Sequence, residues 1–479
     1  MSSLKGNIIL NYINTISGLI FPIITFPYAA RVLMPEGIGL VNFQNSIIGY
    51  IVLLTSLGIP LYAIREIAKC RDDHELRDRT TVEITLLSVL LSFIGYVLVW
   101  LLGEYVPRIH EGVILFYILS LTIIFTGLGV QWFYQGIEDF LFITVRGLIV
   151  RFLCAISLFV FVKEKDDLLV YALIIVGSTV GNNLINFIHL RKFLHLRVIN
   201  WNKLNILRHV KPAFQVFLLN VVSSIYLQLN TIMLGFMTDD RTVGVFTSGT
   251  KITHIFAVIM ASLSTVLLPR CSYLINEGKL EEYGTVVKKS YNLQFLMTIP
   301  ISMIVLMLAR PITICFCGEE YIDSIPVVMI TAPTIIIACL SNLIGFQVLY
   351  PLGKEMLFVI ATLIAALFNI LINFFLIPLF EGVGAAISTL ITEIVVLIGM
   401  ISLGKKYMMF SLLDKQIGLY FLSTIVLMIV VLPCLFMSNL WLQMLLIMLI
   451  AIIIYLSILY LAKDQLFREI LDMITCRKK

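Results

Sequence analysis

The sequence predicts an all-α integral membrane protein, and three observations carry this prediction. Apolar stretches of near twenty residues or more recur some fourteen times between about residues 8 and 462, each long enough to cross a bilayer as a helix. Hydrophobic residues make up 60% of the 479-residue chain and charged residues only 13%, too little polar surface to cover a soluble globule. The mean hydropathy is +1.01. Backbone amides in hydrocarbon need internal partners, so runs this apolar form helices rather than the alternating strands of a barrel.

The apolar stretches define about fourteen expected transmembrane helices. The first six lie at 8–32, 38–62, 82–102, 113–133, 144–162 and 168–190. Six more lie at 212–236, 243–268, 290–309, 324–350, 356–378 and 383–403, and a final pair at 416–436 and 440–462. The first stretch is longer than a signal-peptide core and has no small-residue cleavage site behind it, so we expect it to stay in the mature protein.

Basic residues predict the orientation, because short connections rich in Lys and Arg stay in the cytoplasm. With an even number of spans, both termini lie on one side. Of the 34 lysines and arginines, 26 fall on the side of the N-terminus, Arg146 among them, and six on the other side. Arg151 and Lys251 lie within helices. The sequence therefore predicts cytoplasmic termini, and this topology explains the net charge of +5 without a nucleic-acid partner.

The eight cysteines predict no metal site and no disulfide framework. They are scattered, and most lie in apolar segments. Cys315 and Cys317 form one close pair without a second pair or neighbouring histidines, a pattern that favours packing at a helix end. We expect neither a metal nor another cofactor.

Two sets of six expected helices have similar residues at corresponding helix ends and turns, which indicates an internal repeat. The fourth helix ends GVQWFYQG from Gly129, and the tenth ends GFQVLYPLG from Gly345, so that Gly, Gln and Tyr recur at the same offsets. Short acidic turns join the first helix to the second and the seventh to the eighth, and each has a Gly at the start of the next helix. Because each half has an even number of helices, both halves insert into the membrane with the same orientation and are related by an axis along the membrane normal.

The repeat predicts three parts of the chain. Residues 1–205 form an N-terminal six-helix lobe and 206–405 a C-terminal six-helix lobe, with a basic linker at about 191–211. Residues 406–479 add two transmembrane helices and a short cytoplasmic tail. In repeat-built transporters the substrate site lies at the interface between repeats.

Polar residues within the helices fall on stripes at helical spacing. The residues that we expect to line a polar interior are Asn11, Asn14, Asn182, Asn186, Gln228, His254 and Asn373. Amides and hydroxyls on one face suit hydrogen bonds between helices as well as a hydrated cavity that binds sugar hydroxyls, and the pattern alone does not separate the two.

Charges within the spans point to the function more strongly, because such residues usually face a cavity. Lys251 and Arg151 each lie about two turns inside a helix, and Arg31 lies at the outer end of the first. Arg31 suits either headgroup contact or a binding site. A cationic cavity would bind an anionic cargo, since ammonium and guanidinium groups hold phosphate oxygens strongly at low dielectric. Glu393, near mid-span, is a candidate for ion coupling or for an internal salt bridge.

Several segments resemble the polysaccharide flippases of the multidrug, oligosaccharidyl-lipid and polysaccharide (MOP) exporter superfamily, which export O-antigen and capsule repeat units. The resembling segments, spread over about residues 5–405, include PYAARVLMPEGIG from Pro27, GIPLYAIREIAK from Gly58, QWFYQGIEDF from Gln131 and NILINFFLIPLFEGVGAAISTLITE from Asn369. The family commonly has an acidic residue before the Met-Leu-Gly of its seventh helix, where this chain has Asn230, which puts a proton or sodium role there in doubt.

The resemblance implies a V-shaped, MATE-like bundle of two pseudo-symmetric six-helix lobes plus two C-terminal helices. It implies a flippase of the bacterial inner membrane that moves a polyprenyl-diphosphate-linked oligosaccharide from the cytoplasmic to the periplasmic face by alternating access. A coupling ion, H⁺ or Na⁺, and polysaccharide polymerase or assembly partners are possible within such a system. No covalent chemistry is required, so we expect a transporter and not an enzyme.

Two other functions compete with this interpretation. A multidrug and toxin exporter of the same superfamily would favour acidic residues for cationic drugs, and a carboxylate in the first helix, where this chain has none. A polysaccharide polymerase would need paired carboxylates and a sizeable outer loop. The outer connections here are short, and Asp239 and Asp240 occupy a turn.

Overall fold

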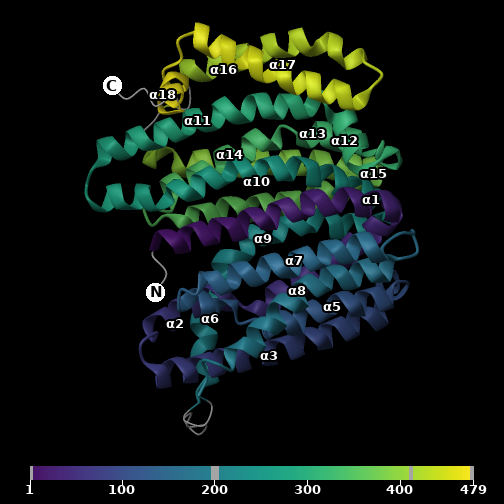
Figure 1. Ribbon diagram of the computed structural model, residues 1–479, viewed down its shortest axis with the longest axis vertical. Helices are drawn as coiled ribbons and strands as arrows, with labels where there is room; N and C mark the ends of the chain where they lie inside the picture. The colour runs from purple at the N-terminus through teal and green to yellow at the C-terminus, as the bar shows by residue number, and fades with distance from the viewer. Residues whose placement is uncertain (1–3, 196–203, 409–410, 412–413, 475–479) are drawn as a thin grey trace. The chain divides into compact units, whose positions relative to one another are not determined.

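The computed structural model describes residues 4–195, 204–408, 411 and 414–474, except for the side chains of some residues near the two ends and in 218–227. Long helices dominate these residues (Figure 1). In the first half they are α1 (Leu4–Ser56), α2 (Ile59–Lys69), α3 (His74–Tyr105), α4 (Pro107–His110), α5 (Val113–Gly127), α6 (Gln131–Gly136), α7 (Phe140–Phe161), α8 (Leu168–Leu190), η2 (Ile206–His209) and α9 (Val210–Met237). In the second half they are α10 (Asp240–Asn276), α11 (Leu280–Met307), α12 (Ala309–Cys317), η3 (Glu319–Tyr321), α13 (Ser324–Thr331), α14 (Thr334–Leu343), η4 (Ile344–Leu349), α15 (Glu355–Gly404), η5 (Lys405–Tyr407), α16 (Lys415–Val431), η6 (Leu432–Phe436), α17 (Leu440–Leu461) and α18 (Gln465–Ile474).

The all-α membrane fold is confirmed. Each of the expected apolar stretches coincides with helical residues, and 11 helical stretches of the described chain are long and apolar enough to cross a membrane. Two of these, at Ile13–Lys69 and Glu355–Tyr407, are more than 50 residues long and each contains two of the expected spans.

Both of these long helices bend where the sequence predicts a connection. α1 is interrupted at Met34, which has φ 60° and ψ 170° and precedes Pro35. A proline disfavours the helical region for the residue before it, so Pro35 favours a break here, although the helix continues through Pro22 and Pro27. α15 is interrupted at Glu381, with φ 49° and ψ −125°. The expected acidic turn between the first two spans and the expected connection between the eleventh and twelfth spans are thus each reduced to little more than one non-helical residue.

Contacts group the chain into two compact units, Met1–Gly244 and Val245–Lys479. In the first unit α1 packs against α3, α5, α7 and α9, and α5 packs against α8. In the second unit α11 packs against α14 and α16, and α16 against α17. The division of the sequence into two six-helix lobes and a C-terminal pair at 205 and 405 stays a prediction.

A buried carboxylate fixes the start of α9 in the first unit. The Glu83 side chain on α3 is fully buried and accepts hydrogen bonds from Arg79 Nε at 2.9 Å, Arg208 Nε at 2.7 Å and the backbone N of Asn205 at 2.8 Å. His209 Nε2 lies 2.8 Å from the same carboxylate. The segment that leads into α9 is therefore held to α3 by charge-assisted hydrogen bonds.

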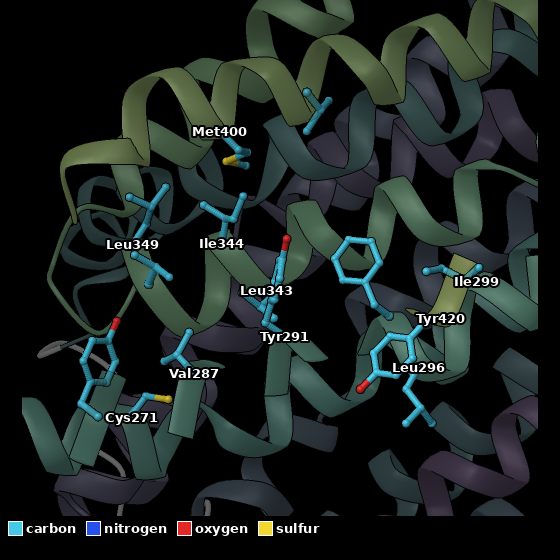
Figure 2. Packing of buried hydrophobic residues seen from close by; sticks show 14 of the residues in the cluster. Cys271, Val287, Tyr291, Leu296, Ile299, Leu343, Ile344, Leu349, Met400 and Tyr420 are labelled. Atoms are coloured by element: carbon cyan, nitrogen blue, oxygen red, sulfur yellow. The ribbon is translucent and has the colours of Figure 1, made fainter. Parts of the chain in front are cut away.

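The second unit has an apolar core to which eight of its helical segments contribute, and Figure 2 shows part of it. Tyr291, Leu296 and Ile299 of α11 meet Leu343 of α14 and Tyr420 of α16, and all five are buried. Ile344 and Leu349 of η4 and Met400 of α15 complete this part of the cluster. The added helix α16 thereby shares one core with the helices of the repeat.

The repeated Gly-Gln-Tyr segments both fall at irregular points of a helix. The first begins in the break between α5 and α6, and the second lies in η4, where the helix widens to π geometry. Gln347 is fully buried and donates to Ser290 Oγ at 2.9 Å, as part of the packing of its unit. Tyr134 is buried whereas Tyr350 is exposed, so the two halves have diverged at this position.

Candidate functional site

The helix α7 carries two arginines inside an otherwise apolar segment. Asp139 caps its N-terminus, where Oδ1 accepts from the backbone N of Phe142 at 3.2 Å, so the helix begins at Phe140. Arg146 therefore lies almost two turns inside the helix, and Arg151 more than three turns. The sequence-based topology counts Arg146 among the basic residues on the side of the N-terminus, two residues into the span expected at 144–162, whereas the helix begins four residues earlier, at Phe140.

Arg146 is a buried cation with neutral partners. Its side chain is only 6% exposed. Nη1 donates to the carbonyl oxygen of Asn182 at 3.1 Å and to Asn186 Oδ1, and Nη2 lies 3.4 Å from Gln131 Oε1. No carboxylate pairs with Arg146 among the described residues. A buried guanidinium costs free energy unless it is paired, so carbonyl and amide oxygens alone compensate this charge incompletely.

Three more polar atoms in this cluster are buried and, within the described chain, lack a hydrogen-bond partner. They are Nε of Arg146, Nδ2 of Asn186 and Oδ1 of Asn182. Two of the three are donors, and they surround a positive charge. Among the residues described, such a cluster has unpaired hydrogen-bond donors and a positive charge, so it suits an incoming hydrogen-bond acceptor, preferably an anion.

Tyr134 and His189 hold the helix α8 in place beside Arg146. The Tyr134 hydroxyl donates to the carbonyl oxygen of Asn186 at 2.9 Å and lies 3.2 Å from His189 Nδ1. The His189 ring stacks on Phe142, with centroids 4.1 Å apart. Phe142 also lies 5.8 Å from the Arg146 guanidinium carbon. The aromatic residues thus fix the position of Asn186 relative to the guanidinium.

Arg151 joins α7 to α1. Its Nη1 donates to the Asn14 carbonyl oxygen at 2.9 Å, to Asn14 Oδ1 at 3.2 Å and to Ser17 Oγ. The guanidinium lies beside Gly18, where a Cβ would be 3.5 Å from Nη2, an ordinary van der Waals contact. Arg151 is half-buried, unlike Arg146. The structure thus brings together four residues of the predicted site in the first unit, Arg151 with Asn14 and, around Arg146, Asn182 with Asn186.

Gln228 lines a separate cavity in the first unit. This cavity has a volume of about 380 Å³ and lies between α1, α2 and α9, with Gly49, Tyr50, Ser56 and Phe217 on its walls. The Gln228 Oε1 is buried without a hydrogen-bond partner in the described chain. Gly49 packs against the Gln228 amide, and a Cβ there would displace this side chain from its present position.

The other predicted site residues lie apart from the two arginines. Arg31 is exposed on α1, and Asn11 lies outside the side chains that the structure describes. In the second unit, Lys251 is half-buried on α10, and His254, one turn further along the same helix, is exposed. Their roles stay predictions.

Asn373 and Glu393 lie on the two arms of α15. Asn373 is fully buried and donates to Asn369 Oδ1 at 3.0 Å, and Asn369 donates to Ser388 Oγ at 3.0 Å and Thr392 Oγ1 at 2.9 Å. Glu393, next to Thr392, is 9% exposed. In this arrangement the amide stripe joins the two arms of the bent helix, which is the role of polar residues between membrane helices.

Comparisons with known proteins agree with this fold. The sequence profile of a family described as "Polysaccharide biosynthesis protein" matches residues 4–275, more than half of the chain, and the MatE profile matches residues 215–375. A putative O-antigen transporter of Escherichia coli (strain K12) is 25% identical over 398 residues, which is 82% of this chain and 95% of the relative. A putative O-antigen transporter of Shigella dysenteriae is 26% identical over 407 residues, 83% of this chain and 99% of the relative.

The fold is also similar to that of a solved structure. The lipid II flippase MurJ in an inward closed conformation aligns with a TM-score of 0.79 at 17% sequence identity, over 95% of this chain and 99% of the other. The named relatives are transporters and flippases, so this protein is a transporter rather than an enzyme. The chain belongs to the polysaccharide biosynthesis protein family.

Proposed function

We propose that this protein moves polyprenyl-diphosphate-linked glycan repeat units from the cytoplasmic to the outer face of the bacterial inner membrane, for surface polysaccharide synthesis. The observation that carries the proposal is the similarity to O-antigen transporters over 82% of the chain and 95% of the relative's length. The membrane-spanning fold supports it, as do the buried Arg146 and the half-buried Arg151 of α7. Both termini face the cytoplasm in this proposal, in keeping with the distribution of Lys and Arg.

The residues on α7 offer a way to bind the diphosphate. Phosphate oxygens would replace the carbonyl and hydroxyl oxygens that now accept from Arg151, and charge-assisted hydrogen bonds to phosphate are stronger than those to neutral acceptors. Lys251 and Arg31 are proposed to contribute further positive charge. The amides of Asn14, Asn182 and Asn186 suit sugar hydroxyls. The lipid tail would stay in the bilayer while the head group crosses.

Transport then requires two conformations that differ in affinity for the head group. Arg146 suits such a difference, because its guanidinium is buried against neutral acceptors. An anion would form stronger hydrogen bonds to it than these acceptors do. A conformation that exposes Arg146 is stabilised further when an anionic head group binds to the guanidinium. Glu393 is proposed as the group that couples this change to H⁺ or Na⁺. A polymerase is the proposed assembly partner on the outer face.

Deletion of the gene in its native host tests the proposal. We expect complete, unpolymerised glycan repeat units to accumulate on polyprenyl diphosphate at the cytoplasmic face. Mass spectrometry of the lipid fraction identifies the units, and a membrane-impermeant reagent applied to spheroplasts and to inverted vesicles locates them. Complementation with the wild-type gene is the control. Complete units on the outer face would instead indicate a polymerase.

A multidrug exporter is the second candidate, favoured by the MatE match to residues 215–375. The same deletion strain separates it from a flippase. A drug exporter predicts unchanged glycan lipids and increased sensitivity to cationic drugs, whereas the flippase proposal predicts accumulated glycan lipid and unchanged drug sensitivity.

A further inference from the structure

The two ends of α15 meet around a hollow in the second unit that the transport proposal does not use. It has a volume of about 1010 Å³ and lies between the start of the helix, at Gly353–Leu357, and its end, at Ser402–Tyr407. The bend at Glu381 is what returns the chain to this point. The volume is at the upper end of the range of ligand sites, about 300 to 1,000 Å³.

Three lysines surround the hollow, and its lining contains no carboxylate. Lys354, Lys405 and Lys406 are all exposed, and none of them forms an ion pair among the described residues. Other lysines of the same unit behave differently, since Lys288 pairs with Asp414 at 3.3 Å and Lys289 with Glu469 at 2.7 Å. The hollow therefore concentrates positive charge that the protein itself leaves uncompensated.

The walls of the hollow combine this charge with apolar surface. Met356, Leu357 and Leu403 line it, and the Lys406 ammonium lies 4.9 Å from the centre of the Tyr407 ring. Gly404, beside the hollow in the sequence, packs on Ile344 and Leu349 of the core, where a Cβ would lie 3.3 Å from Ile344 Cγ2. The end of α15 that lines the hollow is thus part of the packed core of its unit.

An exposed apolar stripe leads away from the hollow along α15. Met356, Ile360, Leu363 and Leu367 are each at least 40% exposed and follow one another at intervals of four, three and four residues, which places them on one helix face. On a membrane-spanning helix such a face contacts acyl chains. The site therefore has the two parts that a bilayer lipid requires, cationic groups at the polar end of a helix and an apolar track below them.

We propose that the hollow formed by Lys354, Lys405 and Lys406 binds the phosphate of an anionic phospholipid in the leaflet that these residues face. Basic pockets beside membrane helices bind anionic head groups, and lysines close to the bilayer surface attract anionic lipid. The Met356 face of α15 holds the acyl chain of the same lipid. This inference does not depend on the cargo that the protein transports.

Native mass spectrometry of the purified full-length protein tests the assignment, with dioleoylphosphatidylglycerol as the anionic probe and dioleoylphosphatidylcholine as the neutral one. The test variant combines Lys354→Gln, Lys405→Gln and Lys406→Gln. The matched control combines Lys69→Gln, Lys192→Gln and Lys211→Gln, which removes the same charge from the first unit.

We expect the wild-type protein to retain phosphatidylglycerol in preference to phosphatidylcholine, and the test variant to bind phosphatidylglycerol at least tenfold more weakly, since each lysine near the surface contributes roughly fivefold. The control variant should change by less than about threefold on the same scale. Equal losses in the two variants, or no loss in either, would overturn the proposal.

Two further measurements keep the result decisive. A variant with arginine at the same three positions should bind phosphatidylglycerol as the wild type does, and failure of this variant to bind would contradict a phosphate site. Undecaprenyl diphosphate without sugar is the third probe. If it binds the hollow more tightly than phosphatidylglycerol does, and the lysine-to-glutamine variant abolishes that preference, the phospholipid assignment is wrong and the site takes the transport lipid instead.

Discussion

Substitution of Gly39 by alanine should destabilise the first unit, although alanine is the better helix former. Gly39 follows the bend in α1 and packs against the start of α10. A Cβ at Gly39 would lie 2.7 Å from the carbonyl carbon of Asp240 and 2.8 Å from the backbone N of Gly244. Contacts below 3.0 Å to backbone force a shift, and overpacking of this kind costs about 1 to 3 kcal/mol. The gain in helix propensity, about 0.5 to 1 kcal/mol, does not offset it.

The contact is reciprocal, which provides a second test of the same geometry. A Cβ at Gly244 would lie 2.7 Å from the carbonyl carbon of Pro35, immediately before the segment that carries Gly39. Gly244→Ala is therefore expected to lower the stability by a similar amount. Gly177 on α8 and Gly418 on α16 are the matched controls, because a Cβ at either position meets nothing within 4 Å. Alanine at these two positions should leave the stability unchanged or raise it.

A thermal-shift assay on the purified protein measures the effect. The reporter is a thiol-reactive dye, which reads the exposure of buried cysteines such as Cys70 and Cys271 on unfolding. We expect Gly39→Ala and Gly244→Ala to lower the melting temperature by about 2 °C or more, and the two control variants not to lower it. Equal melting temperatures for Gly39→Ala and Gly177→Ala would refute the close approach of the two backbones.

Three other predictions concern charged groups. Arg146→Gln should reduce polysaccharide export at least about tenfold, because it removes charge-assisted hydrogen bonds. The control variant Lys192→Gln should not reduce export. Equal export by both variants in the complemented deletion strain would exclude Arg146 from transport. Glu393→Gln should abolish the pH or sodium dependence of transport in proteoliposomes if the carboxylate couples an ion, whereas an unchanged dependence would assign it a structural role. The backbone N of Thr242 donates to the Asp239 carboxylate at 2.8 Å and holds the pKa of this carboxyl below its ordinary value. The ionised Asp239 therefore stabilises the fold at pH values above the ordinary pKa, and this stabilisation is lost as the pH falls through the lowered pKa. Asp239→Asn should therefore flatten the fall in melting temperature between about pH 5 and about pH 3, and an unchanged slope would contradict this.

The helices were predictable because lipid leaves the backbone few alternatives. Length and hydropathy locate the apolar runs, and Pro35 favours the break at Met34. The ends of the helices were harder to predict, because polar residues extend helices beyond their apolar segments. α11 begins at Leu280, ten residues before the apolar run expected at 290, and its first turns are charged. Hydropathy does not detect such extensions, and Lys279, the residue before this helix, forms no side-chain cap that would mark its start.

The candidate site was predicted in part. Arg151 and Asn14 stood out as polar groups inside apolar stretches, and the structure places them in contact. Arg146 was missed, because it lies only two residues after the expected start of its span. The helix cap at Asp139 was the available signal, since a helix that begins at Phe140 puts Arg146 inside. That Arg146 faces Asn186 depends on how α7 packs against α8, which the residue spacing within one helix does not specify.

Transport of a lipid-linked glycan by the purified protein is the central claim, and proteoliposomes test it most directly. A polyprenyl-diphosphate-linked oligosaccharide is placed in the bilayer, and its access to a membrane-impermeant sugar-modifying enzyme is followed with time. The account predicts that wild-type protein makes the inner-leaflet glycan accessible well beyond the half present outside at the start, and that the Arg146→Gln variant does so far more slowly. If wild-type vesicles and protein-free vesicles expose the glycan equally, in the presence of either a proton or a sodium gradient, the account is contradicted.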